Sequence, residues 1–95
     1  MNTTLGLLHL EFHIFQAASL KDKRRQVKSF KDRMAGRFNV SIAEVDAQDN
    51  RRRAVLAVAM VGGDRAYVAG ALQQIINAAA GHRDMILAAS EIEWL

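Results

Sequence analysis

Residues 5–15 read LGLLHLEFHIF, and this stretch indicates the architecture of the domain. Large apolar residues occupy every second position from Leu8 to Ile14. The positions between and beside them are mixed in character: Leu7, His9, Glu11, His13 and Phe15. Alternation with a period of two is typical of a half-buried strand, because successive side chains point to opposite faces of a sheet. The stretch is therefore predicted to be a strand that is covered on one face and open on the other.

A helix is predicted directly after this strand, from Leu20 to Gly36. Ser19 is a good N-cap residue, and Asp22 three residues later approximates a capping box and favours the helix N-terminus. We expect Gly36 to end the helix by taking a left-handed conformation. Apolar residues recur at helical spacing between these points and form one stripe: Leu20, Val27, Phe30 and Met34.

Two further strands follow, joined by a short turn. Alternation from Phe38 to Val45 predicts the second strand, and residues 46–50 (DAQDN) are rich in turn formers. The third strand, Arg53–Val61, is apolar on both faces, which suits the centre of a sheet. The short connection predicts an antiparallel hairpin. The small residues of the third strand lie on one face: Val55, Ala57 and Ala59.

The last third of the chain repeats the order of helix and strand. Asp64 is placed to cap a helix that stops at Gly81, with a stripe of Ala69, Leu72, Ile75, Ile76 and Ala79. Residues 85–95 alternate as a fourth strand, which puts Leu87 and Ala89 on the open face. The order βαββαβ with right-handed crossovers predicts one ferredoxin-like α+β domain over residues 1–95. Both helices then cover one face of a four-stranded antiparallel sheet.

Positive charge is concentrated in the first predicted helix. The chain holds 13 Lys and Arg against 10 Asp and Glu, for a net charge of +3. Between Leu20 and Arg37 lie eight basic and two acidic residues, so this segment carries more than the whole net charge. A second cluster, residues 51–53 (RRR), precedes the third strand. We expect this cluster at the opposite end of the sheet from the N-terminus of the first helix.

Several runs of residues resemble the YlxP-like family of small bacterial proteins. The runs are SLKDKR at 19–24, VKS at 27–29, RFNVS at 37–41 and EVD at 44–46, followed by Asp49, and the likeness covers nearly the whole chain. The resemblance implies a ferredoxin-like fold. It also implies a translation-linked role, because genes of this family often lie beside those for translation initiation and ribosome-maturation factors. It brings no set of catalytic residues. Relatives tend to carry an aromatic residue near position 50, where this chain has arginines.

The basic residues are the first candidate site. A row of cations can bind RNA phosphates or an acidic protein partner, and release of counterions makes phosphate binding salt-dependent. The alternative is a solvated helix face with pairs such as Lys28–Asp32. Base stacking on the sheet is disfavoured, because the third strand holds no aromatic residue. The candidate binding residues are Lys21, Arg24, Arg25, Lys28, Lys31, Arg51, Arg52 and Arg53.

The open sheet face is the second candidate site. Its apolar and small residues favour an interface, and we expect homodimerisation through it. The alternative is a partly polar surface in contact with water, since histidine and glutamate side chains share the face. The candidate interface residues are Leu7, His9, Glu11, His13, Val55, Ala57 and Ala59.

Other patterns give little support to catalysis or to a cofactor. The chain has no cysteine, which excludes thiolate metal sites and cysteine nucleophiles. His9 and His13 would lie ~13 Å apart along a strand, too far to share one metal ion readily. The segment Gly62-Gly63-Asp64 lacks the Gly-Lys-Ser/Thr ending of a nucleotide-binding loop. We therefore predict no catalytic residue, no metal and no cofactor.

The predicted protein is a non-enzymatic accessory protein in the cytoplasm. No apolar run is long enough to span a membrane, and no targeting signal is recognised at the N-terminus. We expect an association with translation or the ribosome, and contact with the phosphates of RNA, such as ribosomal RNA, through the basic helix. The alternative function is a homodimeric interaction module that binds an acidic protein partner without RNA.

Overall fold

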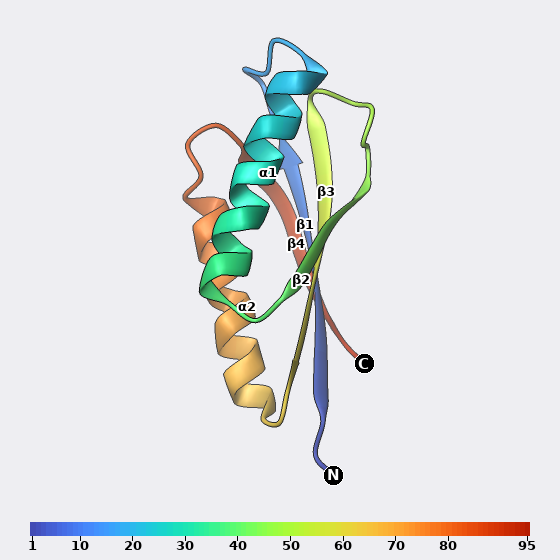
Figure 1. The fold of residues 1–95 in the computed structure, drawn as a ribbon, viewed down its shortest axis with the longest axis vertical. Helices are drawn as coiled ribbons and strands as arrows, with labels where there is room; N and C mark the ends of the chain where they lie inside the picture. The colour runs from blue at the N-terminus through green and yellow to red at the C-terminus, as the bar shows by residue number, and fades with distance from the viewer.

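Two helices pack against one face of a four-stranded sheet in the computed structural model, which describes residues 1–95 (Figure 1). Neighbouring strands are antiparallel, in the order β2-β3-β1-β4. This arrangement confirms the predicted ferredoxin-like α+β fold. The elements in chain order are β1 (Thr4–His13), α1 (Leu20–Arg37), β2 (Ser41–Asp46), β3 (Arg53–Gly62), α2 (Arg65–Ala80) and β4 (Ile86–Trp94).

The core lies between the sheet and the two helices. Alternate residues of β1 and β3 are buried there, which confirms the faces expected from their period of two. The rings of Phe12 on β1 and Phe30 on α1 meet edge to face, with centroids 5.4 Å apart. Each large apolar side chain buried in this layer stabilises the fold by about 1.5–3 kcal/mol. The opposite face of the sheet carries no helix (Figure 1).

Both predicted helix caps are present. Ser19 Oγ accepts the backbone N–H of Asp22 at 3.1 Å, and Asp64 Oδ2 accepts that of Tyr67 at 3.3 Å. The expectation for Gly36 is wrong, because no glycine has a positive φ and α1 continues through Gly36 to Arg37. The backbone N–H of Phe38 donates to the last turn of the helix instead, and the Phe38 side chain packs against the core.

Two glycines let α2 approach the sheet closely. A Cβ atom at Gly6 would lie 2.8 Å from Leu72 Cδ1 and 3.0 Å from Trp94 Cζ3. A Cβ atom at Gly62 would lie 2.8 Å from Val68 Cγ2. These glycines leave the space that the side chains of α2 fill, which is why a larger residue at either position would force the helix or its side chains to shift.

The predicted face of Leu87 on β4 is wrong. A bulge between Glu11 and Phe12 shifts the pairing of β1 with β4, so that Leu87 lies opposite Phe12 and packs against the core. Ile86 lies opposite His13 and is 55% exposed. A bulge adds one residue to a strand and reverses the alternation beyond it, which the period of the sequence alone does not reveal.

One element boundary and one helix face also differ from the prediction. β2 begins at Ser41 rather than Phe38, because residues 38–40 form the connection from α1 while packing partly against the core. The apolar stripe of α2 is rotated relative to the expected one. Its buried members are Val68, Ala71, Leu72, Ile75 and Ala79.

Neither helix is both long enough and apolar enough to cross a membrane.

Candidate functional site

The β2–β3 turn lies at the same end of the molecule as the N-terminus of α1 (Figure 1). The expectation that they lie at opposite ends is therefore wrong. Since β1 and β3 are antiparallel, the last residue of β1, His13, pairs with the first residue of β3, Arg53. The N–H of Ile14 donates to the carbonyl oxygen of Arg52 at 2.9 Å. The short loop that follows β1 then leads directly into α1 beside the turn.

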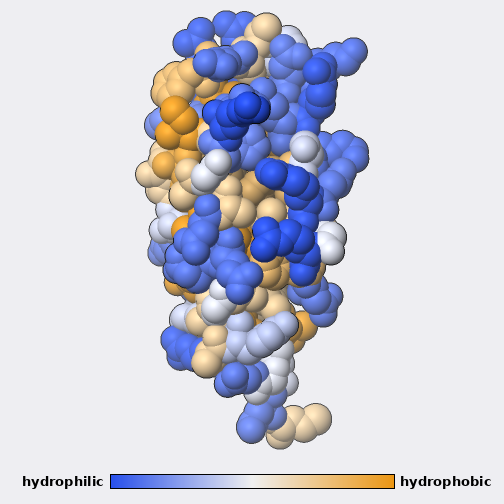
Figure 2. All heavy atoms as spheres, turned by 90° about the vertical axis from the view of Figure 1, so that its left-hand side faces the viewer, coloured by the Kyte–Doolittle hydropathy of each residue, from blue (hydrophilic) through white to orange (hydrophobic).

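This topology brings the two basic clusters together. Arg51 Nη1 donates to the carbonyl oxygen of Ala18 at 3.4 Å, one residue before the helix cap. Hydrophilic residues gather over much of the helix-covered side of the molecule (Figure 2). Among the cations lie the carboxylates of Asp22, Asp32 and Asp49, and that of Glu44 lines the same hollow as Lys28 and Lys31. We call the joined cations the basic surface: Lys21, Arg24, Arg25, Lys28, Lys31, Arg51 and Arg52.

Three cations of the basic surface have a carboxylate partner. The Lys28–Asp32 pair is 2.6 Å long, as expected for a solvated helix face, and Arg25 Nη2 lies 3.3 Å from Asp22 Oδ1. Arg24 Nη2 lies 3.9 Å from Asp49 Oδ1, and this contact joins α1 to the turn. All three cations are exposed, and exposed pairs contribute little free energy. A phosphate can therefore compete with these carboxylates.

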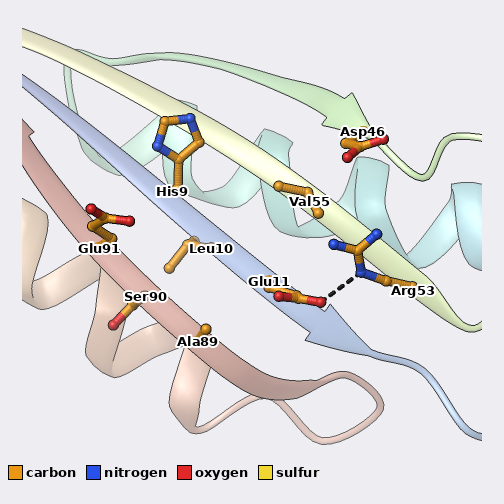
Figure 3. A pocket seen from close by; sticks show the side chains of 9 residues that line it. All are labelled: His9, Leu10, Glu11, Asp46, Arg53, Val55, Ala89, Ser90 and Glu91. Atoms are coloured by element: carbon orange, nitrogen blue, oxygen red, sulfur yellow. Dashed lines mark hydrogen bonds and ion pairs between the residues drawn. The ribbon is translucent and has the colours of Figure 1, made fainter.

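Arg53 does not join the basic surface. Its Nε donates to Glu11 Oε2 at 2.6 Å on the open sheet face (Figure 3). The hydrogen bond from Arg53 is the largest cause that lowers the pKa of Glu11, and the same hydrogen bond raises the pKa of Arg53. His13 Nε2 approaches the same carboxylate at 3.8 Å. This guanidinium is therefore already occupied by a carboxylate.

The seven candidate interface residues share the open face. Leu7 lies opposite Ala59, His9 opposite Ala57, and Glu11 opposite Val55. A shallow hollow of about 260 Å³ crosses the sheet at the charged end of this face. In Figure 3, His9, Glu11 and Glu91 rise toward the viewer from β1 and β4, while Asp46 and Arg53 border the hollow at β2 and β3.

The other end of the open face is apolar. Leu5 lies opposite Val61 at this end, and Val61 is 55% exposed. The alternating residues of β1 thus divide the face into a charged part near His13 and an apolar part near Leu5. No group of three or more His, Asp or Glu side chains gathers here or elsewhere as a metal site.

Lys23 is the residue of this region that sequence reasoning missed. It is the one charged side chain that is fully buried. Its Nζ lies 2.7 Å from Glu44 Oε2 and 2.6 Å from the carbonyl oxygen of Ala47. The spacing offers a signal, because Lys23 precedes Val27 and Phe30 by four and seven residues and so belongs to the buried stripe of α1.

Comparisons with known proteins show the family to which this chain belongs. A family model described as "Protein of unknown function (DUF503)" matches residues 5–92. The chain belongs to the DUF503 family. Among similar proteins is the "Uncharacterized protein YlxP" of Bacillus subtilis (strain 168), which is 35% identical over 72 residues, 76% of this chain and 78% of the relative. The resemblance to the YlxP-like family is thereby confirmed. The DUF503 match includes Lys23, Glu44 and the whole basic surface.

Proposed function

We propose that this DUF503 protein is a non-enzymatic accessory protein that binds RNA phosphates through the basic surface. The observation that carries the proposal is the position of the β2–β3 turn beside the N-terminus of α1, where Arg51 contacts the carbonyl oxygen of Ala18. Two clusters that are separate in the sequence thus form one surface with seven cations and four carboxylates, of which Glu44 is already paired with the buried Lys23. Such a clustered excess of cations is the electrostatic footprint of phosphate-backbone binding.

The binding mode we propose is electrostatic and weakly sequence-specific. The open face of β3 presents Val55, Ala57 and Ala59 and no aromatic ring on which a base could stack. The YlxP-like resemblance supports a translation-linked role, and ribosomal RNA in the cytoplasm is the partner that such a role implies. The acidic protein partner of the alternative function would meet the same cations, so RNA must be tested directly.

The test is the affinity for a fluorescein-labelled RNA stem-loop, measured by fluorescence anisotropy at fixed salt. Arg25→Glu with Lys28→Glu reverses two charges on the exposed face of α1. We expect this variant to lose about tenfold or more in affinity, because two phosphate contacts are replaced by repulsion. The loss of affinity should be about equal for RNA stem-loops of different sequence, because phosphate contacts do not read the bases.

The matched control reverses two charges outside the basic surface. Arg37→Glu with Arg65→Glu changes the net charge by the same amount, at the C-terminus of α1 and the N-terminus of α2. We expect it to retain most of the wild-type affinity. Equal losses in the two variants would show that net charge alone governs binding. Absence of binding by the wild-type protein would contradict the proposal and leave the acidic-protein alternative.

The second candidate function is a homodimeric interaction module, favoured by the apolar end of the open face. β1 and β3 are ten residues long, and the sheet has four strands. With ~3.3 Å per residue and ~4.8 Å between strands, the face covers roughly 600 Å² in each copy. Two copies would bury roughly 1,200 Å², the lower end of the range for stable interfaces.

Sedimentation equilibrium at micromolar concentration tests the homodimer. We expect a mass of two chains for the wild-type protein and of one chain for Ala59→Arg, because Ala59 lies opposite Leu7 at the centre of the apolar part. A charged side chain there would be desolvated without a partner on association. A wild-type mass of one chain would contradict the dimer.

A further inference from the structure

We propose that Lys23 is a positioning residue that fastens the β2–β3 turn to α1 and so joins the two basic clusters into one surface. The part of this inference that concerns RNA rests on the proposed function. The part that concerns the turn does not, because it can be observed in the protein alone.

The contacts of Lys23 are directed at the turn. Its Nζ donates to the carbonyl oxygen of Ala47 at 2.6 Å and approaches that of Gln48 at 3.5 Å. Glu44 Oε2 lies at 2.7 Å, but its angle is outside hydrogen-bond geometry, so charge holds this pair. An ammonium group has three donors. The two carbonyl oxygens that accept from Lys23 and the carboxylate beside it all belong to the end of β2 and the turn, and none belongs to α1 itself.

The turn has a backbone conformation that needs support. Ala47 has φ of 59°, which places it in the left-handed region that residues other than glycine rarely adopt. Its carbonyl oxygen also accepts the N–H of Asn50 at 3.0 Å, so Lys23 binds the same oxygen that closes the turn. Lys23 therefore supports the turn at its most constrained residue.

The other contacts between the turn and α1 are exposed. Arg24 meets Asp49 at 3.9 Å, with side chains that are 59% and 98% exposed. Arg51 reaches the carbonyl oxygen of Ala18 at 3.4 Å in an exposed hydrogen bond. Exposed contacts of this length hold a segment weakly. The backbone hydrogen bond from Ile14 holds Arg52 at the end of β1. The buried ammonium of Lys23 is thus the one buried side-chain contact that holds the turn itself against α1.

A purely structural ion pair would have different consequences. If Lys23 and Glu44 serve only to satisfy each other, replacing both by apolar residues of similar size should restore stability and leave binding intact. If Lys23 positions the turn, the same double replacement restores stability, but the turn is no longer held against α1. The variant Lys23→Met with Glu44→Met separates the two cases, even where Lys23→Met alone fails to fold.

The first measurement is amide hydrogen exchange of the double variant without RNA. We expect exchange at Asn50 and Arg52 to become about tenfold faster or more, while the centre of β1 keeps its protection. Both amides form hydrogen bonds inside the turn, Asn50 to the carbonyl oxygen of Ala47 and Arg52 to Asn50 Oδ1. Unchanged exchange at both amides would overturn the inference.

The second measurement is affinity for the RNA stem-loop. We expect the Lys23→Met/Glu44→Met variant to lose as much affinity as Arg51→Ala with Arg52→Ala, and the four substitutions together to lose no more than either pair. Wild-type affinity in the double variant, or losses that add in the combined variant, would overturn the positioning role. If the wild-type protein binds no RNA, the proposed function fails, and hydrogen exchange still decides whether Lys23 holds the turn.

Discussion

Two ion pairs of almost equal length connect neighbouring elements of this protein in different surroundings. The Lys23–Glu44 pair joins α1 to β2 at 2.7 Å, and the Arg53–Glu11 pair joins β3 to β1 at 2.6 Å. The side chains of the first pair are 0% and 14% exposed, whereas those of the second are 40% and 30% exposed. Distance therefore does not distinguish the pairs, and access to water does.

The comparison shows what burial adds to an ion pair. Water competes for Arg53 and Glu11 and screens their attraction, so either can lose its partner and be solvated. Water cannot solvate Lys23 in this way, and a buried charge without a partner is costly in free energy. The partly exposed Arg53–Glu11 pair mainly alters titration, by lowering the pKa of Glu11. The buried pair can hold a segment of chain in place.

The largest expected effect is on stability after removal of one buried partner. We expect Lys23→Met to lower the free energy of unfolding by about 3–5 kcal/mol, because Glu44 is left without its counter-charge. Urea unfolding followed by circular dichroism measures this change. Lys23→Met with Glu44→Met should recover most of the loss. A loss below about 1 kcal/mol in the single variant would put the buried pair in the same class as exposed pairs.

An intermediate effect on stability is expected from the titration of His82, a partly buried side chain that has no ion-pair partner. Burial is the largest cause that lowers the pKa of His82, and the charge of Arg33 adds to it. The neutral ring is favoured because Nδ1 accepts the N–H groups of Asp84 and Met85, each at 3.0 Å. The stability that His82 contributes is present above its unfolded pKa of about 6.5 and is lost as pH falls through its lower folded pKa.

Urea midpoints measured from about pH 7.5 to pH 5 test the titration of His82. The wild-type midpoint should decline on acidification. His82→Asn offers an amide oxygen in place of Nδ1 and has no proton to gain in this range, so its decline should be smaller. An identical decline in both proteins would assign the pH dependence to other groups.

The smallest effect on stability is expected at the partly exposed Arg53–Glu11 pair. Glu11→Gln should leave the urea midpoint at neutral pH nearly unchanged, since water solvates Arg53 in its place. Arg53→Met should raise the pKa of Glu11 toward the ordinary value of 4.5, which carboxyl NMR titration detects. The lowered pKa of Glu11 contributes stability above its unfolded pKa that is lost as pH falls through the folded one. A midpoint shift as large as that of Lys23→Met would erase the contrast between the pairs.

Local patterns predicted most of the fold. The period of two in residues 5–15 identified β1 and both its faces, and Ser19 and Asp64 marked the helix starts, because these features depend on neighbouring residues alone. The reversed position of Leu87 depends on a bulge that forms between two strands far apart in the sequence. The helix beyond Gly36 depends on the packing of Phe38 against the core.

The candidate site was less predictable because it depends on topology. The basic residues were visible in the sequence, but the end of the sheet at which residues 51–53 lie follows from the antiparallel pairing of His13 with Arg53. The same pairing turns Arg53 toward Glu11 and away from the other arginines. Lys23 fits the apolar spacing of α1, yet its charge masked its burial, because a lysine is rarely buried without a partner.

The slope of the RNA association constant against salt concentration, on logarithmic axes, tests most directly whether α1 and the turn form one phosphate-binding surface. The wild-type protein should show a steep negative slope. Arg25→Glu/Lys28→Glu on the helix and Arg51→Ala/Arg52→Ala on the turn should each reduce its magnitude by about two, or about one for each lost phosphate contact. A flat wild-type slope, or a slope unchanged by the substitutions in the turn, would contradict the single surface.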